Sequence, residues 1–436
     1  MTPRPPRLVC HGCGTVVPAS DPLVFACPSA RDGDDVDHVL EPDLDLEDAA
    51  FPVDGEADGA CESPFLRYGP LLHVVREARA RGRSDAEVED AVRRLDDRVA
   101  AVDGRGFVET PFLRADGVPG VPSLLVKIEA GGVAGSHKAR HLFPVALHLD
   151  LAGAPRSRPL AIASCGNAAL AAAVVARAAE RPLRVFVPDD APPSVTARLG
   201  ALGAEVNRVR RDDGEGPAGD PCVHAFRRAV RDGAVPFSVQ GPENGRVVEG
   251  ARTIAWEIVS AVRRGVAPLP EHVVVQVGGG ALLSAVASGF AIARAVGAVE
   301  RIPVFHAVQS AGGAPFVEAC RRLAEGGPGA AAAAARQRSS AMRPWPVAPR
   351  SIARGILDDE TYDWFVGARA VLEGGGRALT VTDDEIVAAT ALARELSPAP
   401  VCETGAAGLA GARRLAADGV LSADGPVAVL FTGRSR

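Results

Sequence analysis

The sequence predicts an α/β protein in which parallel sheets are flanked by helices. Short apolar runs rich in β-branched residues recur along the chain, and helical segments separate them. Strands and helices that alternate in this way form parallel sheets with helices on both faces. With 436 residues, the chain is also long enough to form two domains or more.

The alternation begins near residue 61. The predicted strands are residues 123–128, 159–163, 183–188, a short stretch at 205–206, and 272–277. The predicted helices are residues 168–179, 194–202 and a segment that begins after residue 280.

Two segments lack this alternation. Residues 41–58 are strongly acidic, and we interpret them as a solvated linker or a wrapping arm. Residues 325–350 contain a Gly-Gly-Pro-Gly stretch, six consecutive alanines and several prolines. We interpret this second segment as a mobile surface connection that could act as a lid.

The composition is that of an ordinary globular protein, with 47% hydrophobic and 23% charged residues. A net charge of −6 provides no basic surface for nucleic acid or for an anionic membrane. No run approaches the roughly 20 unbroken apolar residues of a membrane span, and the N-terminus is not followed by an apolar signal core. The eight cysteines are scattered, which favours free thiols in a reducing compartment. We therefore expect a cytoplasmic protein that binds neither nucleic acid nor membrane.

The first sixty residues contain a candidate metal site. Cys10 and Cys13 are spaced as in a zinc knuckle, and Cys27 follows at a distance typical of a zinc ribbon. Ala30 occupies the place of a fourth cysteine, so His38 is the candidate fourth ligand of a structural Cys₃His site. The alternative is a degenerate ribbon that folds without metal.

Only two of the 48 basic Lys and Arg residues are lysines, Lys127 and Lys138. Arginine stays protonated near neutral pH, whereas a desolvated lysine can become a free amine and attack a carbonyl. The Schiff-base link to pyridoxal phosphate needs such an amine. The alternative is that GC-rich coding replaced most lysines and that two remained by chance.

Three turns after predicted strands contain the unusual residues. The first is residues 135–140, which include Lys138, and the second is residues 164–168, at the start of a helix. The N–H groups of that helix start suit a carboxylate, and Asn167 adds an amide donor. The third turn, residues 278–282, is a glycine-rich nest that suits a phosphate. Ligands of such sheets bind at the carboxyl ends of strands, although each turn alone could be merely structural.

Together and in this order, these turns resemble those of the fold-type-II pyridoxal-phosphate enzymes, from about residue 60 to the C-terminus. Within this group the chain is most similar to threonine synthase and the threonine dehydratases. The similar segments are the N-terminal cysteines and residues 164–169, 249–255, 306–309, 351–356, 381–385 and 403–407. The resemblance implies a large domain built from residues 61–150 and 246–436, a small α/β domain over 151–245, and a zinc-ribbon-like segment over 1–60.

The resemblance also implies roles for individual residues. Lys138 is implied to form the Schiff base, next to His137, and Asn167 to contact the 3′-oxygen of the cofactor. Thr432 matches the hydroxyl that faces the pyridine nitrogen. The implied phosphate-binding residues are Gly278, Gly279, Gly280, Ala281 and Leu282. The implied substrate-binding residues are Ser136, Ser164, Cys165, Gly166 and Ala168.

The chain departs from threonine synthases at several positions. Ala139 stands where an acidic residue usually follows the lysine, and Arg252 replaces a usual lysine. Val247 occupies the place of the arginine that would hold a substrate phosphate. Arg140 and Arg246 could still bind an anionic group, or they could form ion pairs. O-Phosphohomoserine is therefore an open question as substrate.

The expected reaction is elimination or replacement at the β or γ carbon of an α-amino acid, with Lys138 moving the α-proton. One alternative is a serine/threonine-type ammonia-lyase or a β-replacement enzyme of specialised metabolism. Another is a catalytically silent binding protein that kept the fold. By resemblance we expect a homodimer.

Overall fold

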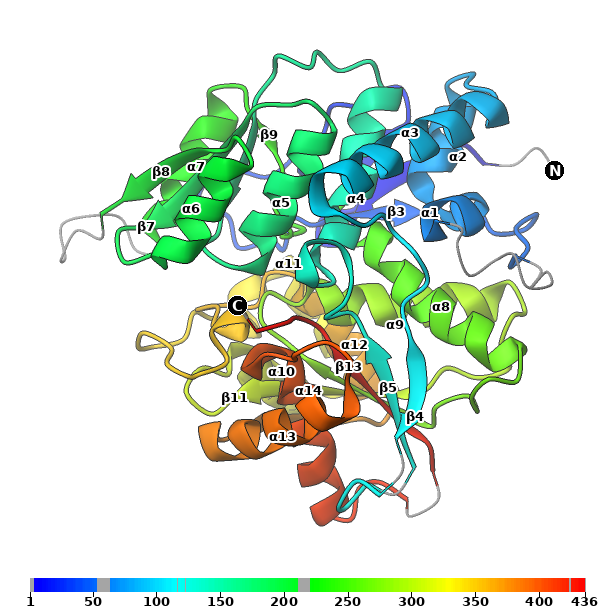
Figure 1. The fold of residues 1–436 in the computed structure, drawn as a ribbon, viewed down its shortest axis with the longest axis vertical. Coiled ribbons are helices and arrows are strands. Elements are labelled where there is room, and N and C mark those ends of the chain that lie inside the picture. The colour runs from blue at the N-terminus through cyan, green and yellow to red at the C-terminus, as the bar shows by residue number, and fades with distance from the viewer. Residues whose placement is uncertain are drawn as a thin grey trace.

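The structure is a computed structural model that describes residues 4–52, 63–115, 117–121, 123–210, 220–422 and 425–435. Cys61 and the later part of the predicted acidic linker lie outside the described residues. The described chain forms a three-stranded, a six-stranded and a four-stranded sheet. Figure 1 shows the four-stranded sheet on one side of the molecule and the six-stranded sheet below it, with the C-terminus between them.

The six-stranded sheet has the order β12-β11-β10-β13-β5-β4. Its strands are β12 (Ala378–Val381), β11 (Val304–Ser310), β10 (His272–Gln276), β13 (Val427–Phe431), β5 (Leu124–Ile128) and β4 (Phe112–Ala115). All neighbours are parallel except β4, which is antiparallel to β5. The carboxyl ends of the five parallel strands therefore lie at one edge of the sheet.

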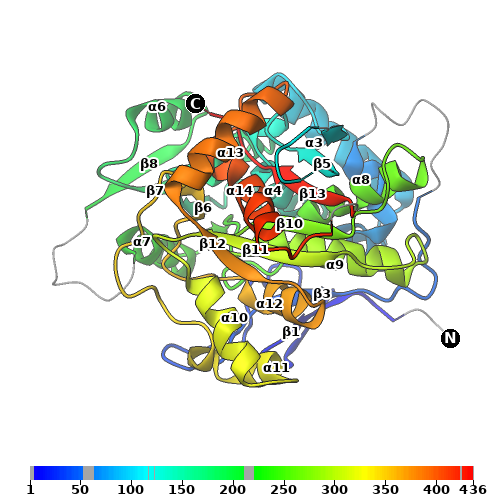
Figure 2. The same ribbon diagram turned by 90° about the horizontal axis from the view of Figure 1, so that it is seen from below.

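Both faces of this sheet are covered by helices, as Figure 2 shows. Val274 of β10 packs in the cluster that contains α13 (Asp383–Leu396) and α14 (Glu403–Ala417). Its neighbours Val273 and Val275 pack on the opposite face, in the cluster of α8 (Arg252–Arg263) and α9 (Ala281–Ala295). This two-residue alternation is that of a strand buried on both faces, and it explains the unbroken apolar sequence of β10.

The four-stranded sheet has the order β8-β7-β6-β9 and is parallel throughout. Its strands are β6 (Leu160–Ala163), β7 (Leu183–Pro188), β8 (Glu205–Val209) and β9 (Val235–Pro236). The neighbouring helices are α4 (Lys138–Leu151), α5 (Asn167–Ala178), α6 (Pro193–Ala201) and α7 (Pro221–Arg231). The start of α4 and the start of α5 both follow the turn after a strand end.

The N-terminal sheet joins β1 (Arg7–Cys10) to β2 (Val16–Pro18) and to β3 (Leu40–Asp43), both antiparallel. Residues 41–43, which we predicted to belong to a solvated linker, are thus part of strand β3. The remaining helices are α1 (Pro64–Arg67), α2 (His73–Ala80), α3 (Asp85–Asp103), α10 (Pro315–Glu325), α11 (Ala330–Arg336) and α12 (Trp364–Glu373). Short 3₁₀ turns cover Gly69–Leu71, Val133–Gly135, Glu249–Ala251, Arg338–Ser340 and Arg354–Ile356.

The prediction of a mobile surface connection over residues 325–350 did not anticipate that the alanine run forms a helix. The six alanines begin α11, and Ala334, Ala335 and Met342 are buried. Alanine has the highest helix propensity because it loses no side-chain entropy in a helix, so the run folds once its face can pack. Whether this segment moves over the site stays a prediction.

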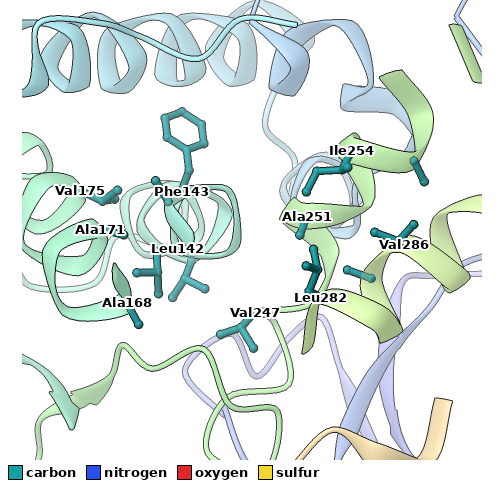
Figure 3. Packing of buried hydrophobic residues seen from close by; sticks show 14 of the residues in the cluster. Leu142, Phe143, Ala168, Ala171, Val175, Val247, Ala251, Ile254, Leu282 and Val286 are labelled. Carbon is teal, nitrogen blue, oxygen red and sulfur yellow. The ribbon is translucent and has the colours of Figure 1, made fainter. Parts of the chain in front are cut away.

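The main apolar core joins the helices that begin at the two sheets. Figure 3 shows Leu142 of α4 between Ala168 of α5 and the pair Val247 and Leu282, the latter at the start of α9. The starts of α4, α5 and α9 therefore converge on one region. Among the described residues, no helix combines the length and apolarity that a bilayer crossing requires.

Candidate active site

Lys138 is the first residue of α4, and a tight turn separates this helix start from the end of β5. In the 3₁₀ turn Val133–Gly135 that precedes it, Ala134 and Gly135 have φ angles of 54° and 69°. A Cβ atom at Gly135 would lie 2.6 Å from the side chain of Arg434. Glycine is therefore required at this position, both for the left-handed backbone and for the close approach of the C-terminal segment.

The Lys138 amine has no hydrogen bond or ion pair with any described residue. Burial lowers its pKa, and the carboxylates of Asp358 and Asp363 oppose this effect. Burial also holds the pKa of His137 well below its ordinary value, so this imidazole is neutral. Its Nδ1–H donates to the carbonyl of Thr432 at 3.2 Å. The lysine is therefore a desolvated amine beside a neutral imidazole, with the carboxylates of Asp358 and Asp363 close enough to oppose part of the effect of burial.

Thr432 follows β13 and lies beside this lysine turn. Its Oγ1 accepts a hydrogen bond from Nε2 of Gln276, at the end of β10, over 2.8 Å. The Thr432 hydroxyl is thereby left with its own proton to donate. A β-bridge between Ser136 and Gly433 joins the lysine turn to the same strand end.

The turn between β6 and α5 reaches the same place from the four-stranded sheet. Asn167 Nδ2 lies 2.7 Å from the position that a Cβ atom would take at Gly433. Within this turn, Ser164 Oγ accepts a hydrogen bond from the N–H of Gly166 at 3.3 Å. The backbone N–H groups of Asn167 and Ala168, at the start of α5, find no acceptor among the described residues. Cys165 is partly exposed in this turn, and burial raises the pKa of its thiol.

The glycine turn after β10 presents a second set of free N–H groups. No described residue accepts from the backbone N–H groups of Gly279, Gly280, Ala281 and Leu282. Gly280 has a φ angle of 92°, and a Cβ atom there would lie 2.5 Å from the carbonyl oxygen of Asp363. This helix start, with its dipole and its unpaired donors, suits a phosphate.

The family described as pyridoxal-phosphate dependent enzyme matches residues 105–433. The chain belongs to this family. Threonine synthase of Methanocaldococcus jannaschii is 25% identical over 338 residues, which cover 74% of each protein. A serine dehydratase-like protein of Rattus norvegicus is 32% identical over 184 residues, 41% of this chain and 51% of that protein. The crystal structure of a threonine deaminase from T.th. has a TM-score of 0.59 at 23% identity, over 81% of this chain and 99% of that one.

The predicted fold class and the predicted pyridoxal-phosphate dependence are thus confirmed, and so is the similarity to threonine synthases. Within this pyridoxal-phosphate enzyme, the structure brings the predicted residues Lys138, Asn167 and Thr432 together. It also places Gln276 and Asp358 beside these residues, and the sequence analysis predicted neither of them. A glutamine in an otherwise valine-rich strand was a usable signal for Gln276, whereas no pattern distinguished Asp358 from its acidic neighbours.

Two arginines that we considered for an anionic substrate group are excluded. Arg140 pairs with Glu129 at 2.8 Å and with Glu257 at 2.5 Å, and all three side chains are buried. Arg246 forms a two-pronged ion pair with Glu77, at 2.5 and 3.2 Å. Both guanidinium groups satisfy buried carboxylates, because a buried charge requires a partner.

The N-terminal cysteines and His38 form a cluster apart from the lysine. The candidate ligand atoms of Cys10, Cys13, Cys27 and His38 all lie within 4.8 Å of one another. The Cys10 Sγ to His38 Nδ1 distance is 3.7 Å, and Cys13 Sγ lies 3.6 Å from Cys27 Sγ. Nε2 of His38 contacts the carboxylate of Asp34 at 3.1 Å. A carboxylate behind a ligand histidine orients the imidazole, as in many zinc sites.

Proposed function

We propose that Lys138 holds pyridoxal phosphate and that the chain catalyses elimination or replacement at the β or γ carbon of an α-amino acid. The observation that carries the proposal is the unpaired Lys138 amine, which lies beside Asn167 and Thr432. The unpaired N–H groups at the starts of α5 and α9 fit the carboxylate of an amino acid and the phosphate of the cofactor.

Each residue would have a distinct task in this reaction. The N–H groups of residues 279–282 would bind the phosphate, and Asn167 would orient the ring through its 3′-oxygen. The Thr432 hydroxyl would donate to the ring nitrogen, because Gln276 already occupies its acceptor side. When bound, the cofactor supplies an electron-withdrawing ring that makes the α-proton of the substrate labile.

Lys138 Nζ would then take the α-proton and later deliver it. Burial lowers the pKa of this amine, which favours the neutral form that a general base requires. The loop formed by Ser164, Cys165, Gly166 and Ala168, with Ser136 nearby, would hold the α-carboxylate. Once the α-proton has left, a group on the β carbon could depart. A group on the γ carbon could depart only after a β-proton is removed as well, and in either case water or another nucleophile could then add.

The first test is the absorption spectrum of the purified protein with pyridoxal phosphate. We expect a visible band of the kind that lysine-bound pyridoxal phosphate gives, and we expect at least one of O-phosphohomoserine, serine and threonine to shift it. The band arises from the Lys138 link, and its shift reports replacement of that link by the substrate amine. A protein that shows no band even with excess cofactor would contradict the proposed function.

A serine/threonine-type ammonia-lyase is the second candidate. Val247, at the place of a phosphate-binding arginine, is fully buried and apolar, and Arg246 is paired with Glu77. Formation of a keto acid and ammonia from serine or threonine would favour this candidate over threonine synthesis. A band that no amino acid shifts would instead support a silent binding protein. Homodimer formation and a cytoplasmic location stay predictions.

We also propose that Cys10, Cys13, Cys27 and His38 hold one structural zinc ion. The 3.6 and 3.7 Å separations match the edge of a tetrahedron with zinc–sulfur bonds of about 2.3 Å. The site has four protein ligands and no open position, so its role is structural.

Metal analysis tests this proposal. We expect about one zinc ion per chain in the purified protein. Cys27→Ser should lose the ion and lower the unfolding temperature, because the metal would cross-link β1 to the segment before β3. Cys320→Ala is the matched control, since Cys320 is a buried thiol of α10 outside the cluster. Equal zinc contents in both variants would exclude the cluster as the metal site.

A further inference from the structure

Residues 354–363 cross directly over the glycine turn of the candidate active site. The hydroxyl of Thr361 donates to the carbonyl of Gly278 at 3.1 Å, and the N–H of Asp363 donates to the carbonyl of Gly279 at 2.8 Å. These bonds fasten the segment to the turn, so its side chains have defined places beside the site.

Asp358 is the residue of this segment that lies against the first glycine. Its Oδ2 is 2.7 Å from the position that a Cβ atom would take at Gly278, and 3.7 Å from that position at Gly279. The carboxylate has no hydrogen bond or ion pair with a described residue. Burial raises its pKa to about 6, while the nearby Lys138 amine acts in the opposite direction. At pH 8 the group is therefore an ionised carboxylate without an ion pair, close enough to Lys138 for the two charges to affect one another.

The surroundings of Asp358 are acidic. Asp359, Glu360 and Asp220 all lie near enough to raise its pKa further. Glu360 is paired with Arg338 at 2.9 Å, but Asp359 and Asp220 have no ion pair with a described residue. The charged side chains at this side of the site are therefore mainly negative. The free N–H groups of residues 279–282 would already be taken by the cofactor phosphate, so a second phosphate, on the substrate side chain, would be repelled.

Among the described cations around the site, Arg354 and Arg434 are exposed to solvent, and the others are paired with carboxylates. Arg227 pairs with Glu243 at 2.7 Å, and Arg140 and Arg246 are buried in ion pairs. Arg354 is exposed, and its charge opposes the rise in the pKa of Cys165, which lies in the loop that would bind the α-carboxylate. The charge of Arg354 would therefore attract the α-carboxylate, which every amino-acid substrate has, rather than a group at the end of the substrate side chain.

We propose that Asp358 selects α-amino acids whose side chain ends in a cation, such as the amine of a diamino acid, over those whose side chain ends in phosphate. This inference rests on the function proposed above, because the α-amino group must reach Lys138. It assigns Asp358 as a specificity-determining residue that contacts the distal group of the substrate.

Spectral titration of the holoenzyme at pH 8 tests the inference. The probes are 2,3-diaminopropionate, 2-aminobutyrate and O-phosphohomoserine, and the readout is the apparent Kd from the shift of the cofactor band. We expect 2,3-diaminopropionate to bind at least about 10-fold more tightly than O-phosphohomoserine, since a charge-assisted hydrogen bond in a partly buried site has this effect or a larger one.

Asp358→Asn should raise the apparent Kd of 2,3-diaminopropionate by about 10-fold or more and change the apparent Kd of 2-aminobutyrate by less than about 3-fold. Asp358→Glu keeps the charge and should retain the preference. The matched control is Asp97→Asn, which removes one negative charge from an exposed position of α3. This control should change none of the three Kd values.

The outcomes separate the two proposals. A normal cofactor band with preferred binding of O-phosphohomoserine would overturn the role of Asp358 and leave the proposed function intact. Equal weakening of all three ligands in Asp358→Asn would show a general structural role and would also overturn the inference. The complete absence of a cofactor band would contradict the proposed function itself, and the inference would fall with it.

Discussion

Lys138→Ala is expected to remove the cofactor band and to lower turnover by at least about 10³-fold, because it deletes both the attachment point and the general base. The only other lysine, Lys127, cannot take over. It is fully buried, and its Nζ is held by Glu257 at 2.5 Å and by the carbonyl of Thr110 at 2.6 Å. Parallel absorption spectra and single-turnover assays of the two proteins check this result.

Two further variants make this experiment specific. Lys138→Arg keeps the positive charge but cannot lose its proton near neutral pH, so it should be as inactive as Lys138→Ala. Arg369→Met, at an exposed ion pair of α12, should keep both the band and the turnover. Retention of either property by Lys138→Ala would show that the attachment site is elsewhere.

Lys127→Met is expected to lower the free energy of unfolding by about 3–5 kcal/mol, because it leaves the buried carboxylate of Glu257 with only one of its two cationic partners. Lys127, Arg140, Glu129 and Glu257 form a buried group of two cations and two anions. Burial acts to raise the pKa of Glu257, but Arg140 and Lys127 together hold it below its ordinary value. When one cation is removed, the remaining cation no longer compensates fully for the free energy that burial of the Glu257 carboxylate costs.

Urea unfolding at pH 7, followed by circular dichroism, measures this effect. The exposed pair Arg369 and Glu373, with a 2.8 Å separation, is the control, and Arg369→Met should cost less than about 1 kcal/mol. The double variant Lys127→Met with Glu257→Gln restores the charge balance and should be more stable than the sum of the single changes predicts. A loss below about 1 kcal/mol for Lys127→Met would mean that water or relaxation compensates the carboxylate.

Half of the strands of the two large sheets, namely β5, β6, β7, β8 and β10, could be predicted from the sequence because their signals are local, whereas β4, β9, β11, β12 and β13 were not predicted. The predicted strands 123–128 and 272–277 correspond to β5 (Leu124–Ile128) and β10 (His272–Gln276), within one residue at each end. The predicted helix 168–179 corresponds in the same way to α5 (Asn167–Ala178). Apolar runs and glycine turns reflect the chemistry of adjacent residues, which does not depend on distant parts of the chain.

The roles of the charged residues could not be predicted in this way. Arg140 and Arg246 lie close in sequence to candidate site positions, and there they suggested contacts with an anionic substrate. Their partners Glu257 and Glu77 are 117 and 169 positions away. A buried ion pair is decided by which segments the fold brings together, and no local pattern contains that information.

The sequence by itself determined the parallel α/β architecture, the candidate lysine and the order of the three turns, because each depends on residues close together in the chain. The tertiary structure alone decided that Lys127 is neutralised by Glu257, that Gln276 satisfies Thr432, and that Asp358 lies against Gly278 from a distant part of the chain. The physical reason is that burial and electrostatic pairing act through space. They depend on contacts between distant segments, and these contacts form only when the strand ends meet.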